Sequence, residues 1–279
     1  LNSGTVRLVG GPNRIFVPVS TAPNATSTNP TEAPDARLFL SSGGVLDLAG
    51  NDQAVVGLFN NAVSAALPGS GGIVTNSSTT TATFANVLGR ANSTFAGSIT
   101  GNLNYVRAGA YGMTMTAPNT YTGSTTLAGD ITTLQDLGTF ENTSRVTIIG
   151  VPLAWNDTGI AAVTNRLPST APIDMLGGSL YWTSRADAVS AIATGTVTPV
   201  RGASWLGVTT TAPGSATLTI AGIGPRSQGS TLVFTGNASD STALGDNPFI
   251  KIASAPTLSN GLIGGWAITT VANPSGNNS

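Results

Sequence analysis

The chain contains no cysteine and no histidine, and Lys251 is its single lysine. These absences exclude disulfides, thiol nucleophiles, imidazole bases and imidazole metal ligands. Any catalysis would therefore depend mainly on carboxylates, hydroxyls, arginine and tyrosine. Charged residues make up only 8% of the 279 residues, whereas ordinary soluble domains carry about 25%. So weakly charged a surface offers little protection against self-association.

Basic clusters and long apolar runs are also missing. The ten arginines are dispersed and the isoelectric point is about 5.2, so we expect no nucleic-acid partner. No run of about 20 apolar residues is present, so we expect no membrane span. The sequence shows no start methionine and no signal peptide, which favours a mature piece or a fragment of a longer secreted protein.

Glycine is abundant, with 35 residues, and it introduces short runs in which apolar and hydroxyl side chains alternate. Such runs occupy residues 4–8, 44–48, 178–182, 214–220 and 229–234. A glycine corner followed by alternation is typical of a turn and a strand. The copies recur at intervals of roughly 20 to 40 residues or multiples of that, a period that indicates stacked supersecondary units. With 40% hydrophobic residues and a net charge of -1, the chain is not expected to be disordered.

The clearest unit is GMTMTAPNTYTGSTTL at residues 112–127. It resembles the autotransporter-associated β-strand repeat, whose usual form is G-x-L-x-L-x-G-x-N-x-Y-x-G-x-T-x-[VL]. The matching positions are Asn119, Tyr121, Gly123 and Thr125. Residues 44–53, 165–173 and 261–267 also resemble segments of that family. The resemblance implies a large secreted protein of the bacterial cell surface.

The predicted fold class is all-β, a right-handed parallel β-solenoid with irregular loop insertions that forms one elongated unit over residues 1–279. Inward positions should be the alternating apolar ones. They include Val6, Leu8, Leu46, Leu48, Leu218 and Ile220. We expect a surface loop at residues 18–34 and a flexible end at residues 273–279. The alanine-rich residues 186–194 are compatible with a short helix.

Acidic residues are scattered along the chain. Stacking could still bring distant ones together, as a β-helical polysaccharide-active enzyme would require, and the candidates are Asp47, Asp130, Asp136 and Asp174. Turn and cap carboxylates are the competing interpretation, and we expect no enzyme and no cofactor. Asp240 and Asp246 offer oxygen ligands for one calcium ion, although an ordinary Asx turn competes there as well.

Aromatic residues are few, at 6% of the chain, and they favour core positions over a sugar-binding strip. One of Tyr181 and Trp182 should face inward because neighbours on a strand point to opposite sides. Trp155 and Trp205 are the candidates for exposure. The threonine- and serine-rich outer face is nevertheless a candidate surface for glycans.

The functional hypothesis follows from the two ends of such a stack. A terminal strand leaves its edge unpaired and the apolar core open, unless something caps it. The expected assembly positions are Val6 and Leu8 at one end, with Trp266 and Ile268 at the other. We therefore expect a non-catalytic extracellular building block of a bacterial surface fibre, coat or stalk, whose partners are copies of itself stacked end to end. The alternative is a passenger or adhesin that presents loops to a host surface or glycan.

Overall fold

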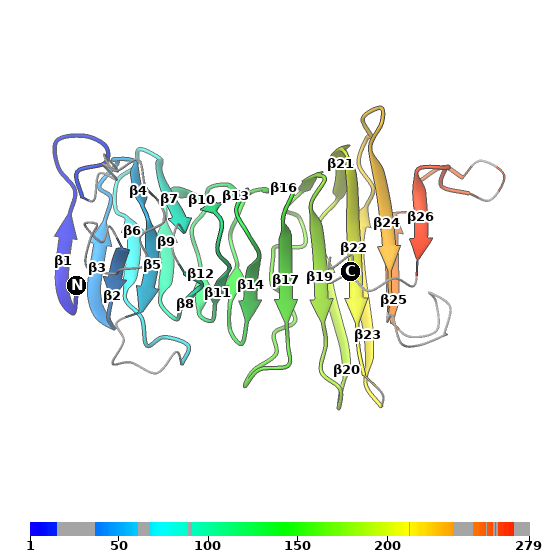
Figure 1. Cartoon of the computed structure of the whole chain (residues 1–279), viewed down its shortest axis with the longest axis horizontal. Coiled ribbons are helices and arrows are strands. Elements are labelled where there is room, and N and C mark those ends of the chain that lie inside the picture. The colour runs from blue at the N-terminus through cyan, green and yellow to red at the C-terminus, as the bar shows by residue number, and fades with distance from the viewer. Residues whose placement is uncertain are drawn as a thin grey trace.

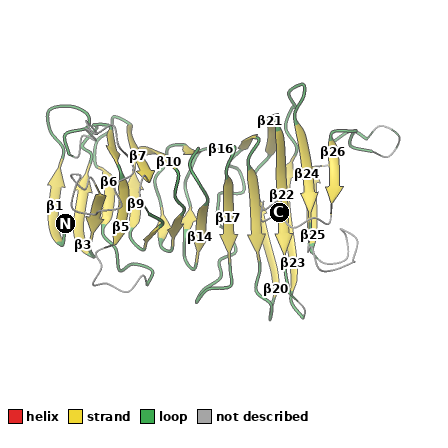
Figure 2. Ribbon diagram, viewed as in Figure 1, coloured by secondary structure: helices red, strands yellow, loops and turns green. Residues whose placement is uncertain are grey.

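The computed structural model describes residues 1–15, 37–60, 67–88, 91–211, 213–236, 248–254, 256–258, 260 and 262–270. The expected loop at 18–34 and the expected end at 273–279 lie outside these residues, as do Asp240 and Asp246. All regular structure in the described part is strand, as Figure 2 shows. Accordingly, this part contains no helix able to cross a membrane.

The strands are arranged in sheets in which each named pair of neighbours runs parallel. An eight-stranded sheet contains, in chain order, β8 (Ser93–Phe95), β11 (Met113–Met115), β14 (Thr132–Gln135), β17 (Pro152–Asn156), β19 (Ser179–Thr183), β22 (Ala203–Thr209), β24 (Thr231–Thr235) and β26 (Ala267–Thr270). A seven-stranded sheet contains β4 (Gln53–Val55), β7 (Ala82–Leu88), β10 (Leu103–Gly109), β13 (Thr125–Leu127), β16 (Val146–Ile149), β18 (Ile173–Leu176) and β21 (Val197–Arg201).

The remaining strands form four smaller sheets. One contains β1 (Ser3–Arg7), β3 (Gly43–Asp47), β6 (Ile73–Asn76) and β9 (Ser98–Gly101). The others are β2 (Arg37–Leu40) with β5 (Gly57–Asn60), β12 (Pro118–Asn119) with β15 (Thr139–Phe140), and β20 (Val189–Thr194) with β23 (Ser215–Gly222) and β25 (Phe249–Ser254). β5 contacts β8 of the eight-stranded sheet, and β9 contacts β12 of another small sheet.

The chain visits these sheets in rotation and advances by one strand in each circuit. From β7 to β15 it passes repeatedly from the seven-stranded sheet to the eight-stranded sheet and then to a small sheet. Residues in register are 19 apart at Met113 and Thr132 and 40 apart at Val6 and Leu46, which agrees with the interval expected from the sequence. Figure 1 shows the resulting row of strands along the long axis, from blue to red.

The glycine-led runs of the sequence form strands as predicted. They correspond to β1, β3, β19, β23 and β24. The alternating apolar residues point inward as predicted, and Leu46, Leu218 and Ile220 are at most 1% exposed in the core. Leu8 and Leu48 are buried as well. Burying one such side chain contributes about 1.5–3 kcal/mol, so the inward columns supply the main stabilising free energy.

Two expectations were wrong. Residues 186–194 do not form a helix, because Val189–Thr194 is β20 and pairs with β23 along its whole length. Alanine favours helices locally, but the ladder to β23 and burial of Ile192 outweigh that preference. Val6 is not buried either and remains 39% exposed. It lies opposite Leu46 on one side, and β1 is one of the two edge strands of its sheet.

The core also contains an ion pair between Arg166 and Asp157, whose side chains are 0% and 3% exposed. Asp157 accepts a second hydrogen bond from the indole N–H of Trp182 at 2.7 Å. Arg166 donates to the carbonyl oxygens of Asp136, Gly138 and Asn156. Burial lowers the pKa of Arg166 and Asp157 opposes that shift. This network joins the residues after β14, the end of β17 and β19.

Replacing Asp157 with Asn should lower the free energy of unfolding by about 3–5 kcal/mol, because the buried Arg166 loses its countercharge. The matched control is Asp187→Asn, since Asp187 pairs with Arg185 at 3.2 Å but its side chain is 73% exposed. That substitution should cost less than about 1 kcal/mol. Urea unfolding measures both. Equal losses of unfolding free energy would show that the buried ion pair stabilises the fold no more than the exposed one.

Candidate functional site

Asn119 of the repeat motif joins three successive circuits through its side chain. Its Oδ1 accepts the N–H of Ile99, and its Nδ2 donates to the carbonyl oxygens of Ala117 and Thr139, each at 3.0 Å. Ile99 and Thr139 are each 20 positions away in sequence. The amide group suits this position because it has both a donor and an acceptor. Asn119 is fully buried, and its role is therefore to link neighbouring circuits.

Of the other three motif residues, Tyr121 and Thr125 are fully buried and Gly123 is partly exposed. Tyr121 packs in a ring cluster with Tyr105 and Phe140, with centroids 6.0 and 5.9 Å away. Its hydroxyl is hydrogen-bonded to Thr125 Oγ1 at 2.5 Å, and Thr125 Oγ1 is bonded to Thr143 Oγ1 at 2.8 Å. Burial raises the pKa of Tyr121 well above its ordinary value and that of Tyr105 to about 12. Both tyrosines thus remain neutral hydrogen-bonding groups.

Gly123 is required by a close approach between circuits. A Cβ atom at this position would lie 2.3 Å from the carbonyl oxygen of Leu103 and 2.6 Å from Asn104 Oδ1. Its N–H donates to that same carbonyl at 3.1 Å, so the backbones cannot separate without losing the bond. The motif is thus a set of contacts that join neighbouring circuits.

Asn76 forms hydrogen bonds between circuits like those of Asn119, and the sequence did not predict them. We call the side-chain bonds of these two asparagines staples. Asn76 Oδ1 accepts from Gly50 N–H at 2.8 Å, and its Nδ2 donates to the carbonyl of Asn102 at 2.6 Å. These partners are 26 positions before and after it. Asn76 lies at the end of β6 and is not part of an Asn-x-Tyr-x-Gly sequence. Its position at the end of a strand was therefore the only signal in the sequence.

The four candidate acids lie in different settings. Asp47 is on β3, and Asp174 is on β18, where it pairs with Arg145. Asp130 accepts the N–H of Ile131 at 2.7 Å, and Asp136 accepts that of Ile160 at 2.7 Å. Across the described ranges, no three residues among His, Cys, Asp and Glu are close enough to hold a metal ion. Of the four, Asp47 and Asp136 are buried, and each accepts hydrogen bonds from backbone N–H groups.

The pKa of Asp47 lies below its ordinary value. Burial opposes its ionisation, but the N–H and hydroxyl of Ser77, the N–H of Ala49 and the charge of Arg7 outweigh it and lower its pKa. The bonds are 3.0, 2.7 and 3.0 Å long, respectively. Arg7 lies 3.3 Å away, but its side chain is 63% exposed, so solvent screens that pair. The short hydrogen bonds therefore matter more than the ion pair.

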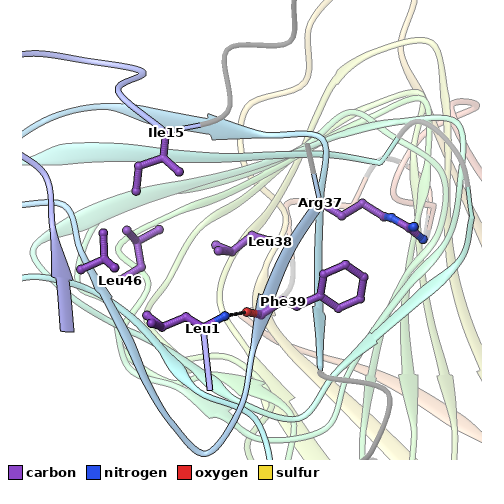
Figure 3. A pocket seen from close by; sticks show the side chains of 7 residues that line it. Leu1, Ile15, Arg37, Leu38, Phe39 and Leu46 are labelled. Atoms are coloured by element: carbon purple, nitrogen blue, oxygen red, sulfur yellow. Dashed lines mark hydrogen bonds between the residues drawn. The ribbon is translucent and has the colours of Figure 1, made fainter. Parts of the chain in front are cut away.

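The end of the stack at β1 opens onto an apolar hollow of about 220 Å³, lined by Leu1, Val6, Ile15, Leu38, Phe39 and Leu46. Figure 3 shows Ile15, Leu38 and Leu46 around it, with the Leu1 ammonium donating to the Phe39 carbonyl at 2.6 Å. Arg37 forms one side. Its guanidinium lies 5.3 Å from the centroid of Phe39 and 5.6 Å from that of Phe59, within cation–π range.

The expected assembly positions thus differ in burial. Val6 is 39% exposed beside the hollow, whereas Leu8 is 2% exposed. At the other end, Ile268 on β26 is 46% exposed. Trp266 is partly buried against the core, and Arg226 lies 5.6 Å from its ring centroid. Val6 and Ile268 are therefore the two assembly positions that present substantial apolar surface.

The aromatic positions agree only partly with expectation. Trp182 faces inward and Tyr181 outward, as the alternation predicted. Trp155 was expected to be exposed, but it is 1% exposed, because it shares the inward side of β17 with Leu153. Trp205 is partly exposed on β22.

A scan against known protein families, a search of curated proteins and a search of solved structures find no match to this chain. The relation to the autotransporter-associated repeat stays a prediction that depends on residues 112–127 and the flanking segments.

Replacing Gly123 with Ala should lower the free energy of unfolding by about 1–3 kcal/mol, because the methyl group forces two circuits apart. Gly265→Ala is the control, since a Cβ there would meet nothing within 4 Å. Chemical denaturation followed by circular dichroism measures both. Equal stabilities for the two variants would contradict the close approach at Gly123.

Asp47→Asn should lower the free energy of unfolding at pH 7 by about 1–3 kcal/mol, because charge-assisted hydrogen bonds are lost. The pKa of Asp47 is lowered in the folded state, so its contribution is complete above the unfolded value of about 3.9. It is lost as the pH falls through the folded value. Wild type and variant should therefore converge in acid unfolding experiments below about pH 4. A constant difference from pH 7 to pH 2 would rule out this linkage.

Proposed function

We propose that the chain is a right-handed parallel β-solenoid and that it serves as a non-catalytic structural element of an extracellular fibre, coat or stalk on a bacterial surface. Successive copies stack end to end. The rotation of the chain through parallel sheets supports the solenoid interpretation. The sequence resemblance supports the location outside the cell.

The observation that carries the proposal is the change in burial along one inward column. Val6, Leu46, Val74 and Ile99 are in register on β1, β3, β6 and β9. Their exposures are 39%, 1%, 0% and 0%. A strand added to β1 would cover Val6 as β1 covers Leu46, and it would close the apolar hollow. A second copy of this chain is the occupant that we propose.

The other end also exposes edge strands. β26 is an edge strand of the eight-stranded sheet, and β25 is an edge strand of its three-stranded sheet. They present Ile268, which is 46% exposed, and Phe249, which is 40% exposed. Contact between unlike ends is heterologous and gives an open filament when the rotation does not close.

Val6→Arg should abolish concentration-dependent assembly of this chain, because a buried, unpaired guanidinium at the contact is strongly unfavourable. The control is Leu137→Arg. Leu137 is 41% exposed, close to the value for Val6, but it lies in the turn after β14. Light scattering and electron microscopy of the wild type and both variants, each shown to be folded by circular dichroism, measure the effect.

Filaments of the wild type and the Leu137→Arg variant, with monomers of the Val6→Arg variant, are the expected result. Assembly that both substitutions reduce equally would point to non-specific association. A wild type that remains monomeric at every concentration would overturn end-to-end stacking and favour the passenger or adhesin alternative.

A further inference from the structure

The eight-stranded sheet is the larger of two described sheets whose strands carry no charge, the other being β12 with β15. None of its strands contains Asp, Glu, Lys or Arg. Strands elsewhere do carry outward charges, such as Asp174 on β18 and Lys251 on β25. Figure 1 shows β14, β17, β19, β22 and β24 side by side along this sheet.

The outward side chains of this sheet form regular rows, because the strands are in register. One row runs through Thr94, Thr114, Thr133, Ala154 and Tyr181. Each of these side chains is partly exposed, whereas the residues before and after each of them in its strand are buried. Neighbouring members lie about 4.7–4.9 Å apart in a sheet.

A second row offers amide and hydroxyl groups. Asn156, Thr183 and Thr209 are in register on β17, β19 and β22. Thr209 Oγ1 donates to Thr183 Oγ1 at 3.2 Å, and Asn156 Oδ1 accepts from Thr158. Hydroxyl oxygens have further acceptor capacity, and the amide nitrogen of Asn156 is a donor.

Two aromatic side chains lie on the same outward side as these rows. Tyr181 lies opposite Gly207, which carries no side chain, and Trp205 lies two residues before Gly207 on the same outward side. Tyr181 and Trp205 are thus diagonal neighbours, at a separation that large side chains can span. Both are partly exposed, and neither belongs to the buried core.

We infer that this outer face binds an uncharged polysaccharide, with Tyr181 and Trp205 as the stacking platform and the row from Asn156 to Thr209 as the hydrogen-bonding edge. A pyranose ring has an apolar C–H face and a rim of hydroxyl groups, which match an aromatic ring and a row of amides and hydroxyls. The absence of charge from the strands disfavours acidic glycans, nucleic acid and anionic lipid surfaces, all of which need basic groups. This site goes beyond the proposed structural function and is independent of the end contacts.

The test is retention of the protein on amorphous cellulose and on starch, with polygalacturonate as the acidic comparison. Wild-type protein should bind at least one neutral polysaccharide with little dependence on salt. The Tyr181→Ala, Trp205→Ala double variant should bind at least tenfold more weakly, whereas Tyr181→Phe and Trp205→Phe should bind within threefold of wild type. Tyr111→Ala is the control, because Tyr111 is 38% exposed but lies in the turn between β10 and β11.

A second variant keeps both aromatic rings, so that the inference can still be tested if the double variant does not fold. Ala154→Arg places a long charged side chain next to Tyr181 on the outward row and should also reduce retention at least tenfold. Failure of the wild type to bind either neutral polysaccharide would overturn the inference, as would binding that neither variant weakens. Dimerisation that Ala154→Arg abolishes, without polysaccharide binding, would assign this face to a second copy instead.

Discussion

The structure depends on the parallel register that places each inward side chain between its counterparts one circuit earlier and one circuit later. Tyr105 lies between Phe84 and Thr125, and Trp155 lies beside Trp182. A side chain inside such a column is covered on both sides by its neighbours in the column, and side chains from other sheets complete its burial, as Phe140 does for Tyr105. A strand at the end of a column is covered on one side only. The exposure of Val6 follows from that geometry, since its own sequence context is as apolar as that of Leu46.

Polar groups inside the stack strengthen the same contacts between circuits. Asn119 and Asn76 each bond to backbone groups both before and after their own circuit. Gly123 allows one backbone to approach another closely enough for such bonds. Since a buried amide without partners is costly, the staples stabilise one register over its alternatives. Apolar columns supply most of the stabilising free energy, and the staples select the register.

The sequence predicted the parts of the fold that local pattern determines. Glycine corners and alternation located β1, β3, β19, β23 and β24, and the motif located Asn119. The burial of Trp155 could have been predicted from its parity with Leu153 in β17. Residues 186–194 were assigned by alanine content, although the spacing of Val189 and Ile192 does not distinguish a helix from an edge strand. Tertiary pairing with β23 decides between them.

Other features have no periodic signal at all. Arg166 and Asp157 are nine positions apart, and Trp182 is a further 25 from Asp157. Their network depends on how the irregular residues after β17 fold back over the core, which no local pattern reports. Whether the four candidate acids lie close together could not be predicted from the sequence either. Their positions in space depend on circuit lengths, and these lengths vary from 19 to 40 residues between paired strands.

Charge is distributed differently over the face of the large sheet and over the edge strands at the two ends. The eight-stranded sheet has no charged residue in its strands, so association through its face is limited mainly by shape and hydrogen bonding. The edge strands β1 and β25 each carry an outward cation, Arg7 and Lys251. Cations on an edge strand disfavour indiscriminate strand addition. Arg7 has Asp47 as a partner at 3.3 Å, whereas Lys251 lies on a strand without an acidic residue. End-to-end contact is therefore more restricted at β25 than at β1, and β26, whose strand is uncharged, is the less protected edge at that end.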